Sequence, residues 1–478
     1  MSLQAVLQKL KSATVRDTAV YMAGSVLGQG INVLVLPVFT RYLSPADYGI
    51  FNYTNSFVTF FAVFPTLSLN SFVLRFYFDA ATEEERRRLF GTIYVFVASL
   101  GFGLLVLELL TVPVMIRAFN IRVPFYPYIA IALITSFLES LTVIPLALFR
   151  AKRRVVQFFL LTFGQAAIAV ASGLVLIVGF RMGLLGRYYG VLVTDIAFAI
   201  ITLVVMLRSV RFCLDREVVA KGLRFSLPLL PAAVSSVVML MGDRIILERY
   251  VEVSAIGIYS VALMLGTAVQ IVVMAFYRAV EPEIFSMVSR RGFKEDVVRM
   301  KNAFLMVIML GGSLLIIFSR EIVTLLVDER FYSSYVLIPF FVVTNILRGA
   351  KILVGVTFHA YKVTVYDALI GGIGAATSIL ANLALIPQFG ILGAAMASIM
   401  TYWVLLIAST SISARVTDIR WGAMKDTASI LVVVAVSVVV MRIEMGGVMA
   451  NALTKAAIVL AIGACMVYRP WRLRLGTS

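Results

Sequence analysis

The stretch FFVVTNILRGAKILVGVTFHAYK, residues 340–362, is long and apolar enough to cross a bilayer, yet it carries four basic or potentially basic side chains. At about 100° per residue, one stripe of a helix would carry Arg348, Lys351, Gly355, His359 and Lys362, which we call the basic stripe. Arg348 would lie roughly 15 Å inside the helix end, near the middle of the hydrocarbon core. Because an arginine there costs on the order of 2.5 to 3.5 kcal/mol, we expect the stripe to face a polar cavity or a partner.

The whole chain shares this apolar character. Of its 478 residues, 61% are hydrophobic and only 14% are charged, against about 45–50% and about 25% in soluble domains. The apolar residues come in blocks of about 20 separated by short basic loops, which predicts an all-α polytopic membrane protein. The two cysteines, Cys213 and Cys465, supply neither a metal-ligand cluster nor a disulfide framework.

Fourteen apolar blocks are candidate transmembrane helices. They cover residues 18–40, 50–73, 90–111, 125–149, 155–180, 185–207, 225–247, 255–280, 303–318, 331–358, 365–387, 391–412, 424–441 and 448–467. Ahead of them, residues 1–17 repeat leucine and valine at helical spacing beside lysines, which predicts an amphipathic segment on the membrane surface.

The distribution of basic residues predicts the orientation. If the N-terminus is cytoplasmic, 28 of the 42 lysines and arginines fall in cytoplasmic segments and 10 in the opposite loops. This bias predicts that both termini are cytoplasmic. The formal net charge of +17 is carried mostly by these loops, so the expected partner is anionic lipid and not nucleic acid.

The chain also repeats itself at a nearly constant offset. RYLSPADYGIFN from Arg41 matches RYVEVSAIGIYS from Arg249 at an offset of 208 residues. The offset is 209 between Phe149 and Phe358, which begin the tripeptides FRA and FHA. A third match, between MGLLG at 182–186 and FGILG at 389–393, has an offset of 207. These matches predict two parallel six-helix bundles related by a pseudo-twofold axis along the membrane normal, plus two C-terminal helices.

The repeat divides the chain into five predicted parts. These are the amphipathic segment 1–17, the first six-helix bundle 18–210, a cytoplasmic linker 211–224, the second six-helix bundle 225–413, and a C-terminal part 414–478 with two helices and a basic cytoplasmic tail. In folds built from such repeats we expect the substrate site near the midplane, where the halves meet.

Three segments resemble a known family: PVFTRYLSPADYGIFNY at 37–53, MGDRIILERYVEVSAIGIYS at 241–260 and ILANLALIPQFGILGAAMAS at 379–398. With the fourteen-span layout they resemble the polysaccharide transporter branch of the multidrug/oligosaccharidyl-lipid/polysaccharide exporter superfamily, which contains O-antigen and exopolysaccharide flippases. The resemblance covers essentially the whole chain. It implies a V-shaped pair of bundles in the bacterial inner membrane that opens alternately to each side.

The resemblance also implies a substrate and partners. The substrate would be an oligosaccharide on a polyprenyl diphosphate, moved from the cytoplasmic to the outer leaflet. A polysaccharide polymerase and glycosyltransferases would be partners in the same biosynthesis.

Cationic side chains would solve the problem of carrying a diphosphate through the membrane, because they form charge-assisted hydrogen bonds to phosphate oxygens. Arg348 and Lys351 are the first candidates, and His359 and Lys362 would form the cytoplasmic approach. Two further candidates near inner span ends are Arg75 and Arg278. The alternative is that these residues pair with acidic neighbours or extend to the membrane surface and only hold the structure together.

Acidic residues inside spans are candidates for ion coupling or gating. The offset of 209 aligns Glu139 with Arg348, so Glu139 is either its counter-ion or a carboxylate that takes up a proton or a sodium ion. Asp195 has the same two interpretations. Asp243 and Arg244 are adjacent near the outer end of a span, so they point about 100° apart and each is expected to contact a different helix. No cofactor is expected apart from such an ion.

Other functions stay open at this point. Within the same superfamily the chain would alternatively be a peptidoglycan-precursor lipid flippase or an ion-coupled drug exporter. From a different class, it would be a membrane polymerase or glycosyltransferase, although no loop exceeds about 25 residues or shows a catalytic cluster. A structural scaffold would give no reason for charges at the midplane.

Overall fold

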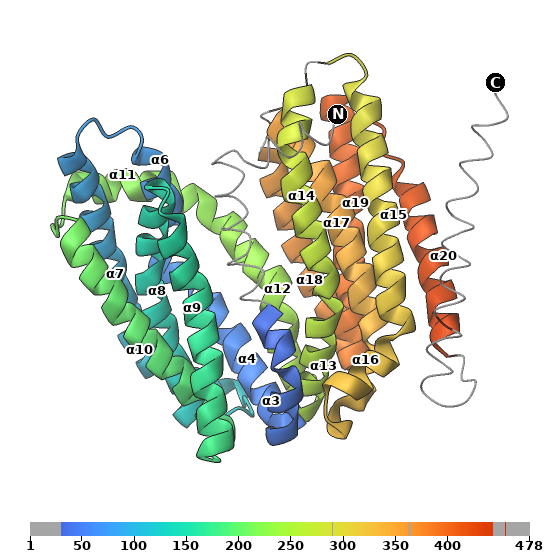
Figure 1. The fold of residues 1–478 in the computed structure, drawn as a ribbon, viewed down its shortest axis with the longest axis horizontal. Helices are drawn as coiled ribbons and strands as arrows, with labels where there is room; N and C mark the ends of the chain where they lie inside the picture. The colour runs from blue at the N-terminus through green and yellow to red at the C-terminus, as the bar shows by residue number, and fades with distance from the viewer. Residues whose placement is uncertain (1–29, 289, 362, 364, 443–454, 456–478) are drawn as a thin grey trace. The chain divides into compact units, whose positions relative to one another are not determined.

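The computed structural model describes residues 30–288, 290–361, 363, 365–442 and 455. Contacts divide the chain into two compact units, unit 1 up to Gly257 and unit 2 from Ile258. Every regular element in the described ranges is a helix, as Figure 1 shows. The predicted all-α class is therefore confirmed for this part of the chain.

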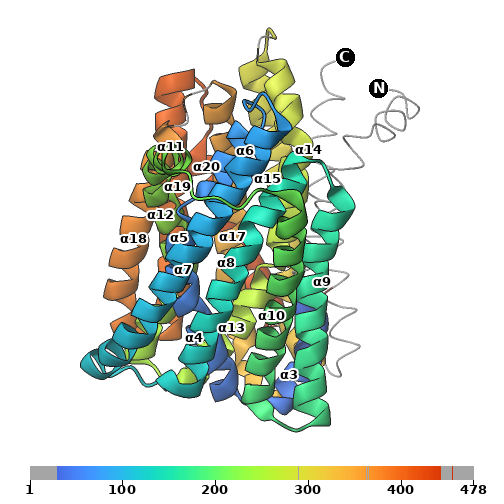
Figure 2. The same cartoon turned by 90° about the vertical axis from the view of Figure 1, so that its left-hand side faces the viewer.

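Unit 1 contains the first thirteen labelled elements and the start of α13. They are α3 (Leu36–Tyr42), α4 (Pro45–Phe61), α5 (Val63–Thr66), α6 (Leu69–Phe76), α7 (Glu83–Phe119), η1 (Phe125–Ile129), α8 (Ala130–Ala151), α9 (Val155–Leu174), η2 (Val175–Gly179), α10 (Gly183–Ser209), α11 (Arg216–Ser226), η3 (Leu227–Leu229), α12 (Leu230–Tyr250) and α13 (Val253–Gly266). Figure 2 shows α8 beside α7 and α10. A buried cluster that includes Leu69, Phe90 and Ile144 joins α6, α7 and α8.

The N-terminus of α4 and the break after α5 are each determined by the conformation of a few neighbouring residues. Ser44 caps α4: its hydroxyl accepts the Asp47 N–H at 3.1 Å, and the Asp47 carboxylate accepts the Ser44 N–H at 2.9 Å. The predicted span 50–73 is broken, because Leu67 and Ser68 adopt left-handed backbone angles with φ of 44° and 59°. The two helical parts are bent by 41°. Pro65 was the only nearby breaker in the sequence.

The first turns of α4 and α13 meet at two glycines that the repeat aligns. A Cβ added to Gly49 would collide with the carbonyl oxygen of Val253, and a Cβ added to Gly257 would collide with that of Pro45. Pro45 and Val253 are also aligned by the offset of 208. Only glycine permits such close backbone approach. The contact is reciprocal, which is the pattern that a twofold relation between equivalent segments produces.

Unit 2 is built around the helix that carries Arg348, Lys351, Gly355 and His359 of the basic stripe. Its elements after α13 are α14 (Ala268–Met287), α15 (Phe293–Ile317), α16 (Ser319–Leu326), η4 (Glu329–Val336), α17 (Ile338–Ala360), α18 (Val365–Phe389), α19 (Ile391–Thr417) and α20 (Ala423–Met441). Helix α17 packs against α14, α15 and α19 (Figure 1) and is the most buried candidate span in the described ranges. Residues 331–336 of the predicted span 331–358 form η4, and α17 begins only at Ile338.

Two lysine–carboxylate pairs connect the C-terminal part to the rest of unit 2. Lys301 of α15 is 1% exposed, donates to the Trp421 carbonyl at 2.9 Å and pairs with Asp426 of α20. Lys455, in the last predicted span, pairs with Glu321 of α16 at 2.5 Å. Because a buried charge left without its partner is strongly destabilising, these pairs fix where the added segments attach.

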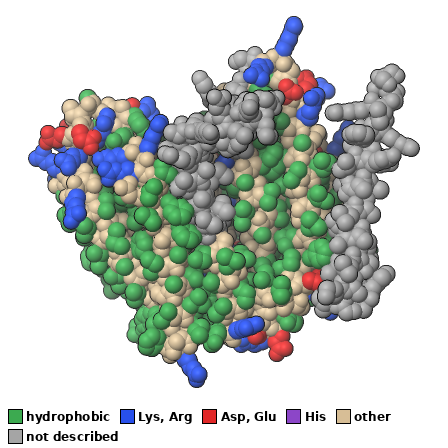
Figure 3. Space-filling view, in the orientation of Figure 1, with side chains coloured by type: hydrophobic (Ala, Val, Ile, Leu, Met, Phe, Trp, Pro, Cys, Tyr) green, Lys and Arg blue, Asp and Glu red, His purple; other side chains and the backbone are tan. Residues whose placement is uncertain are grey.

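Ten helices in the described residues are long and apolar enough to cross a membrane, or eleven if the bent pair in residues 45–76 counts as one span. One of the ten, Val365–Thr417, contains both α18 and α19, which the sequence predicts as two spans. On the face shown in Figure 3, hydrophobic side chains cover the middle of the helices and charged side chains lie toward their ends. The chain is thus a multi-pass membrane protein.

Some predictions lie wholly or partly outside the described residues. These are the amphipathic segment 1–17, the beginning of the span 18–40 and all of the span 448–467 except Lys455. The total of fourteen spans therefore stays a prediction. The predicted division at 211–224 also stays a prediction: the contacts group α12 with unit 1, because α12 packs along α4.

Candidate functional site

Arg348 lies on α17 and is half-buried. Its guanidinium carbon is 5.8 Å from the ring centroid of Tyr402 on α19, within the range of a cation–π contact. Among the described residues, no carboxylate lies within ion-pair distance of Arg348. A cation in the middle of a buried helix is therefore held by a ring and not by an acid.

The next residues of the basic stripe contact one carboxylate that the sequence analysis missed. Lys351 Nζ lies 2.8 Å from Asp367 Oδ1, and His359 Nε2 lies 3.8 Å from Asp367 Oδ2. A Cβ on Gly355 would lie 3.7 Å from the same Oδ1, so the carboxylate sits over the glycine. Asp367 is the one charged residue of the predicted span 365–387, and this was the available signal.

The other basic candidates are not brought into this cluster by any described ion pair. Arg278 is half-buried on α14. Arg75, in unit 1, pairs with Asp79 at 2.6 Å in a local pair whose arginine side chain is 61% exposed. Lys362 lies outside the described residues. Asp367 thus brings Lys351 and His359 together, and Arg348 lies one turn before Lys351 on the same helix.

In unit 1 the two acidic candidates line the same cavity. Glu139 of α8 and Asp195 of α10 both border a cavity of about 330 Å³, and both also border an adjoining cavity of about 140 Å³. Asn55, Glu139, Gln165, Arg187 and Asp195 line the larger cavity, and we call this set the polar cavity. Its mixture of carboxylates, amides and one guanidinium suits a polar or charged occupant.

The two acids differ in their surroundings. Asp195 is 2% exposed, and its Oδ1 accepts a hydrogen bond of 2.9 Å from Gln165 Nε2. Its Oδ2 has no hydrogen-bond partner in the part of the chain that the structure describes. The Glu139 side chain is exposed to the cavity. A buried carboxylate oxygen without a partner is a candidate position for an ion, a proton or a ligand.

Arg187 is a functional candidate in unit 1 that the sequence did not single out, because it lies only two residues inside the predicted span 185–207. It lies on α10, and its guanidinium carbon is 4.0 Å from the Phe39 ring centroid and 4.2 Å from that of Phe51. Arg187, Val191 and Asp195 all line the cavity, as their four-residue spacing on one helix face allows. That spacing was the available signal.

Asp243 and Arg244 correct one expectation. Arg244 Nη1 lies 3.5 Å from Asp243 Oδ1, and the backbone N–H of Arg244 donates to the same oxygen at 2.7 Å. The prediction that adjacent residues on a helix would not meet is therefore wrong here. The long arginine folds back along α12, where Nη1 also donates to the Leu240 carbonyl at 2.9 Å. The predicted pairing of Glu139 with Arg348 joins different units and stays a prediction.

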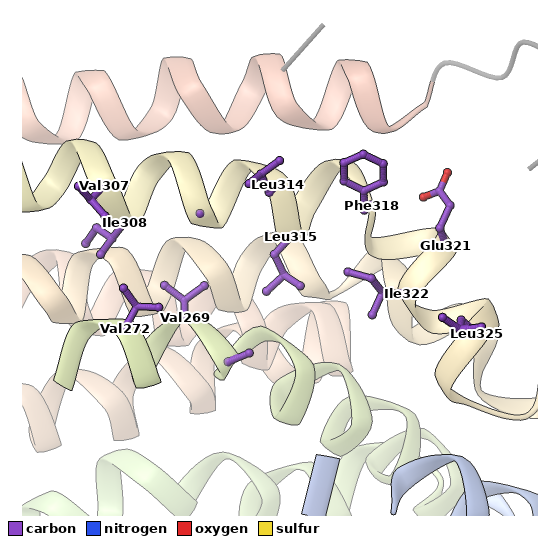
Figure 4. Close-up of a pocket in the computed structure, with 12 residues that line it drawn as sticks. Val269, Val272, Val307, Ile308, Leu314, Leu315, Phe318, Glu321, Ile322 and Leu325 are labelled. Atoms are coloured by element: carbon purple, nitrogen blue, oxygen red, sulfur yellow. The ribbon is translucent and has the colours of Figure 1, made fainter. Parts of the chain in front are cut away.

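A third feature is a largely apolar pocket of about 580 Å³ in unit 2. Figure 4 shows valines, isoleucines and leucines of α14, α15 and α16 along its wall, with Glu321 near one end. Glu321 is already paired with Lys455. This pocket offers few groups for a diphosphate or a sugar, so we do not assign the charged part of a substrate to it.

Comparisons with known proteins agree on the fold. The sequence profile of the polysaccharide biosynthesis protein family matches residues 14–288, whereas no curated protein matches. The structure is similar to the lipid II flippase MurJ in its inward closed conformation, with a TM-score of 0.72 and 14% identity over 96% of this chain and 99% of that one. It is also similar to an inward-facing multidrug resistance transporter of the MATE family and MOP superfamily, with a TM-score of 0.63 and 12% identity over 85% and 95% of the chains. A third similar structure is a MOP superfamily transporter from Pyrococcus furiosus, with a TM-score of 0.56 and 13% identity over 87% and 95%.

Proposed function

Because the chain belongs to the polysaccharide biosynthesis protein family, we propose that it is a flippase for an oligosaccharide carried on a polyprenyl diphosphate. It moves this lipid from the cytoplasmic to the outer leaflet of the bacterial inner membrane, for synthesis of a surface polysaccharide such as O-antigen or exopolysaccharide. It works by alternating access of two six-helix bundles, with fourteen spans and both termini cytoplasmic. Its partners are anionic lipids and the polymerase and glycosyltransferases of the same biosynthesis.

One observation carries the substrate assignment: Arg348 is a half-buried cation inside a membrane helix with no described carboxylate partner. Intramembrane charges are costly and mark substrate or ion pathways. A phosphate group supplies the missing anion and accepts the bidentate hydrogen bonds for which a guanidinium is suited. Lys351 holds the second phosphate, and His359, Lys362, Arg75 and Arg278 form the approach.

We assign ion coupling or gating to acidic residues of unit 1. Glu139 and Asp195 share a cavity, and Asp195 has a buried oxygen without a described partner. Uptake of a proton or a sodium ion would satisfy that oxygen. Asp243 and Arg244 form a buried contact on α12 and have a gating role.

The second candidate is a flippase for a peptidoglycan precursor, favoured by the similarity to the lipid II flippase MurJ. In both candidate functions the substrate is a lipid with a diphosphate, so the basic stripe would bind either substrate. They differ in the sugars.

The test uses the full-length protein in vesicles that contain fluorescent lipid-linked oligosaccharide or fluorescent lipid II. We expect flipping of the lipid-linked oligosaccharide, and loss of flipping in Arg348→Ala at equal protein content. Arg415→Ala, an exposed arginine on α19, is the control and should be as active as the unchanged protein. Flipping of lipid II alone would support the second candidate, and full activity of Arg348→Ala would reject the site.

A further inference from the structure

Asp367 lies where an anionic ligand of the basic stripe would lie. Lys351, Gly355 and His359 follow one another at four-residue spacing on α17, and the Asp367 carboxylate contacts the two basic side chains and sits over the glycine. A carboxylate and a phosphate present the same kind of negatively charged acceptor oxygen to a lysine. The carboxylate therefore neutralises Lys351 as a phosphate would.

This contact also holds two helices together. Helix α18 packs along α19, whereas it touches α17 at few places. Within the described residues, the Asp367 contacts are the only hydrogen bonds or ion pairs between side chains of α17 and α18. The first turn of α18 is thus held to α17 by one carboxylate, beside a ring contact of 6.3 Å between Phe358 and Tyr366 and the short connection between the helices.

The pair is accessible to a competitor. The Asp367 and Lys351 side chains are 33% and 19% exposed, and ion pairs that remain partly solvated contribute little to stability. Arg348 lies one turn before Lys351 and has no described acidic partner. A diphosphate has two groups of acceptor oxygens, so it can engage Arg348 and Lys351 together, which a single carboxylate does not.

From this geometry we propose that Asp367 is a resident anion that the diphosphate of the substrate displaces from Lys351, which removes the polar contact between the first turn of α18 and α17. The inference rests on the proposed function and adds to it a step that links arrival of the substrate to movement of a helix. In the absence of substrate, the Asp367 contact keeps Lys351 neutralised and α18 attached. Lys351 then pairs with a phosphate in place of a carboxylate, and the released Asp367 carboxylate, already 33% exposed, stays beside His359 and solvent.

The first test measures binding of farnesyl diphosphate, with farnesol as the uncharged control, to the purified full-length protein in lipid nanodiscs. Asp367→Asn removes the competing charge and keeps the shape, so we expect its Kd for farnesyl diphosphate to fall by roughly fivefold. Arg348→Ala should raise the Kd. The matched control is Asp418→Asn, because Asp418 pairs with Lys294 at the same distance of 2.8 Å but lies outside the stripe. Its Kd should not change.

The second test follows the helix itself. Spin labels at Met306→Cys on α15 and Leu369→Cys on α18 occupy exposed positions within unit 2. Farnesyl diphosphate should shift the distance between the labels in the otherwise unchanged protein, and Asp367→Asn should show the shifted distance without ligand. Asp367→Glu keeps the charge and should behave like the unchanged protein.

The outcomes distinguish failure of the diphosphate site from failure of the proposed displacement of Asp367. If Arg348→Ala weakens binding but Asp367→Asn leaves the Kd and the label distance unchanged, the diphosphate site holds and the displacement of Asp367 is wrong. If the unchanged protein binds farnesyl diphosphate no better than farnesol, the diphosphate site of the proposed function is itself wrong, and the displacement falls with it.

Discussion

The basic stripe of unit 2 and the polar cavity of unit 1 stabilise membrane charges in different ways. In the stripe, Lys351 and His359 share the carboxylate of Asp367. In the polar cavity, Glu139, Arg187 and Asp195 line one space, and no ion pair joins them in the described structure. Arg187 is instead held between two aromatic rings.

The difference indicates how each region accepts an occupant. A ligand of the stripe has to compete with a carboxylate that is already there. An occupant of the polar cavity fills a space whose polar groups already face it, so it displaces no side chain. Three substitutions test this contrast and a fourth, at Arg75, lies outside both regions; we give them from the largest expected effect to the smallest.

Reversal of the charge at Arg348 should have the largest effect. Arg348→Glu puts an anion where a diphosphate is expected to bind, and we expect flipping to fall by at least about a hundredfold. Adding Glu139→Arg tests the predicted pairing of the two positions. Recovery of protein level without flipping would mean that the pair supports folding and Arg348 also binds substrate, whereas full recovery of flipping would make Arg348 a structural residue.

Asp195→Asn should come next. Asparagine keeps the hydrogen bond to Gln165 through its carbonyl oxygen but removes the charge, so the protein should fold while flipping falls by about tenfold or more. A flipping assay with an imposed proton or sodium gradient measures the effect, and the response to the gradient should disappear. A variant that keeps both the rate and the gradient response would show that the cavity has no coupling role.

Arg187→Lys should change stability more than transport. Lysine keeps the charge but lacks the flat guanidinium that stacks between Phe39 and Phe51. We expect a loss of about 1–2 kcal/mol, seen as a lower Tm of the purified protein. An unchanged Tm would indicate that the rings do not hold this side chain.

Arg75→Ala should have the smallest effect. Its pair with Asp79 is exposed and local, and such pairs contribute roughly 0–1 kcal/mol. Flipping should stay within about twofold of the unchanged protein, because Arg75 is 61% exposed and salt ions of the solvent screen charges at this surface. A large loss of flipping with normal protein level would instead make Arg75 an indispensable part of the approach of the diphosphate.

The helices and their apolar character could be predicted from the sequence, because the cost of exposing backbone groups to lipid leaves few alternatives. The predicted span 331–358 corresponds to the candidate membrane helix α17, Ile338–Ala360, apart from its first residues. The break at Leu67 and Ser68 was not predicted, since neither residue type normally signals a left-handed turn. The repeat predicted which segments are equivalent, and the meeting of Gly49 with Val253 and of Gly257 with Pro45 agrees with it.

The candidate site was only partly predictable. Arg348, Glu139 and Asp195 stand out because a charge within an apolar block is costly wherever the helix lies. Asp367 and Arg187 also carry a signal in the sequence, but which side chains they contact depends on tertiary packing. The Asp243–Arg244 contact shows a different limit: a helical wheel gives the direction of a Cβ and not the reach of a flexible arginine.

The reciprocal contact of Gly49 and Gly257 has a consequence for how this chain evolved. Residues that exchange equivalent positions form an isologous contact, which is the kind that two copies of one protein make across a twofold axis. Inside a single chain, such a contact is what gene duplication and fusion of a self-associating ancestor would leave behind. Each glycine meets a backbone carbonyl, Gly49 that of Val253 and Gly257 that of Pro45, so the side chains at the two carbonyl positions are free to differ. The two glycines are not free to change, because any side chain there would break the contact.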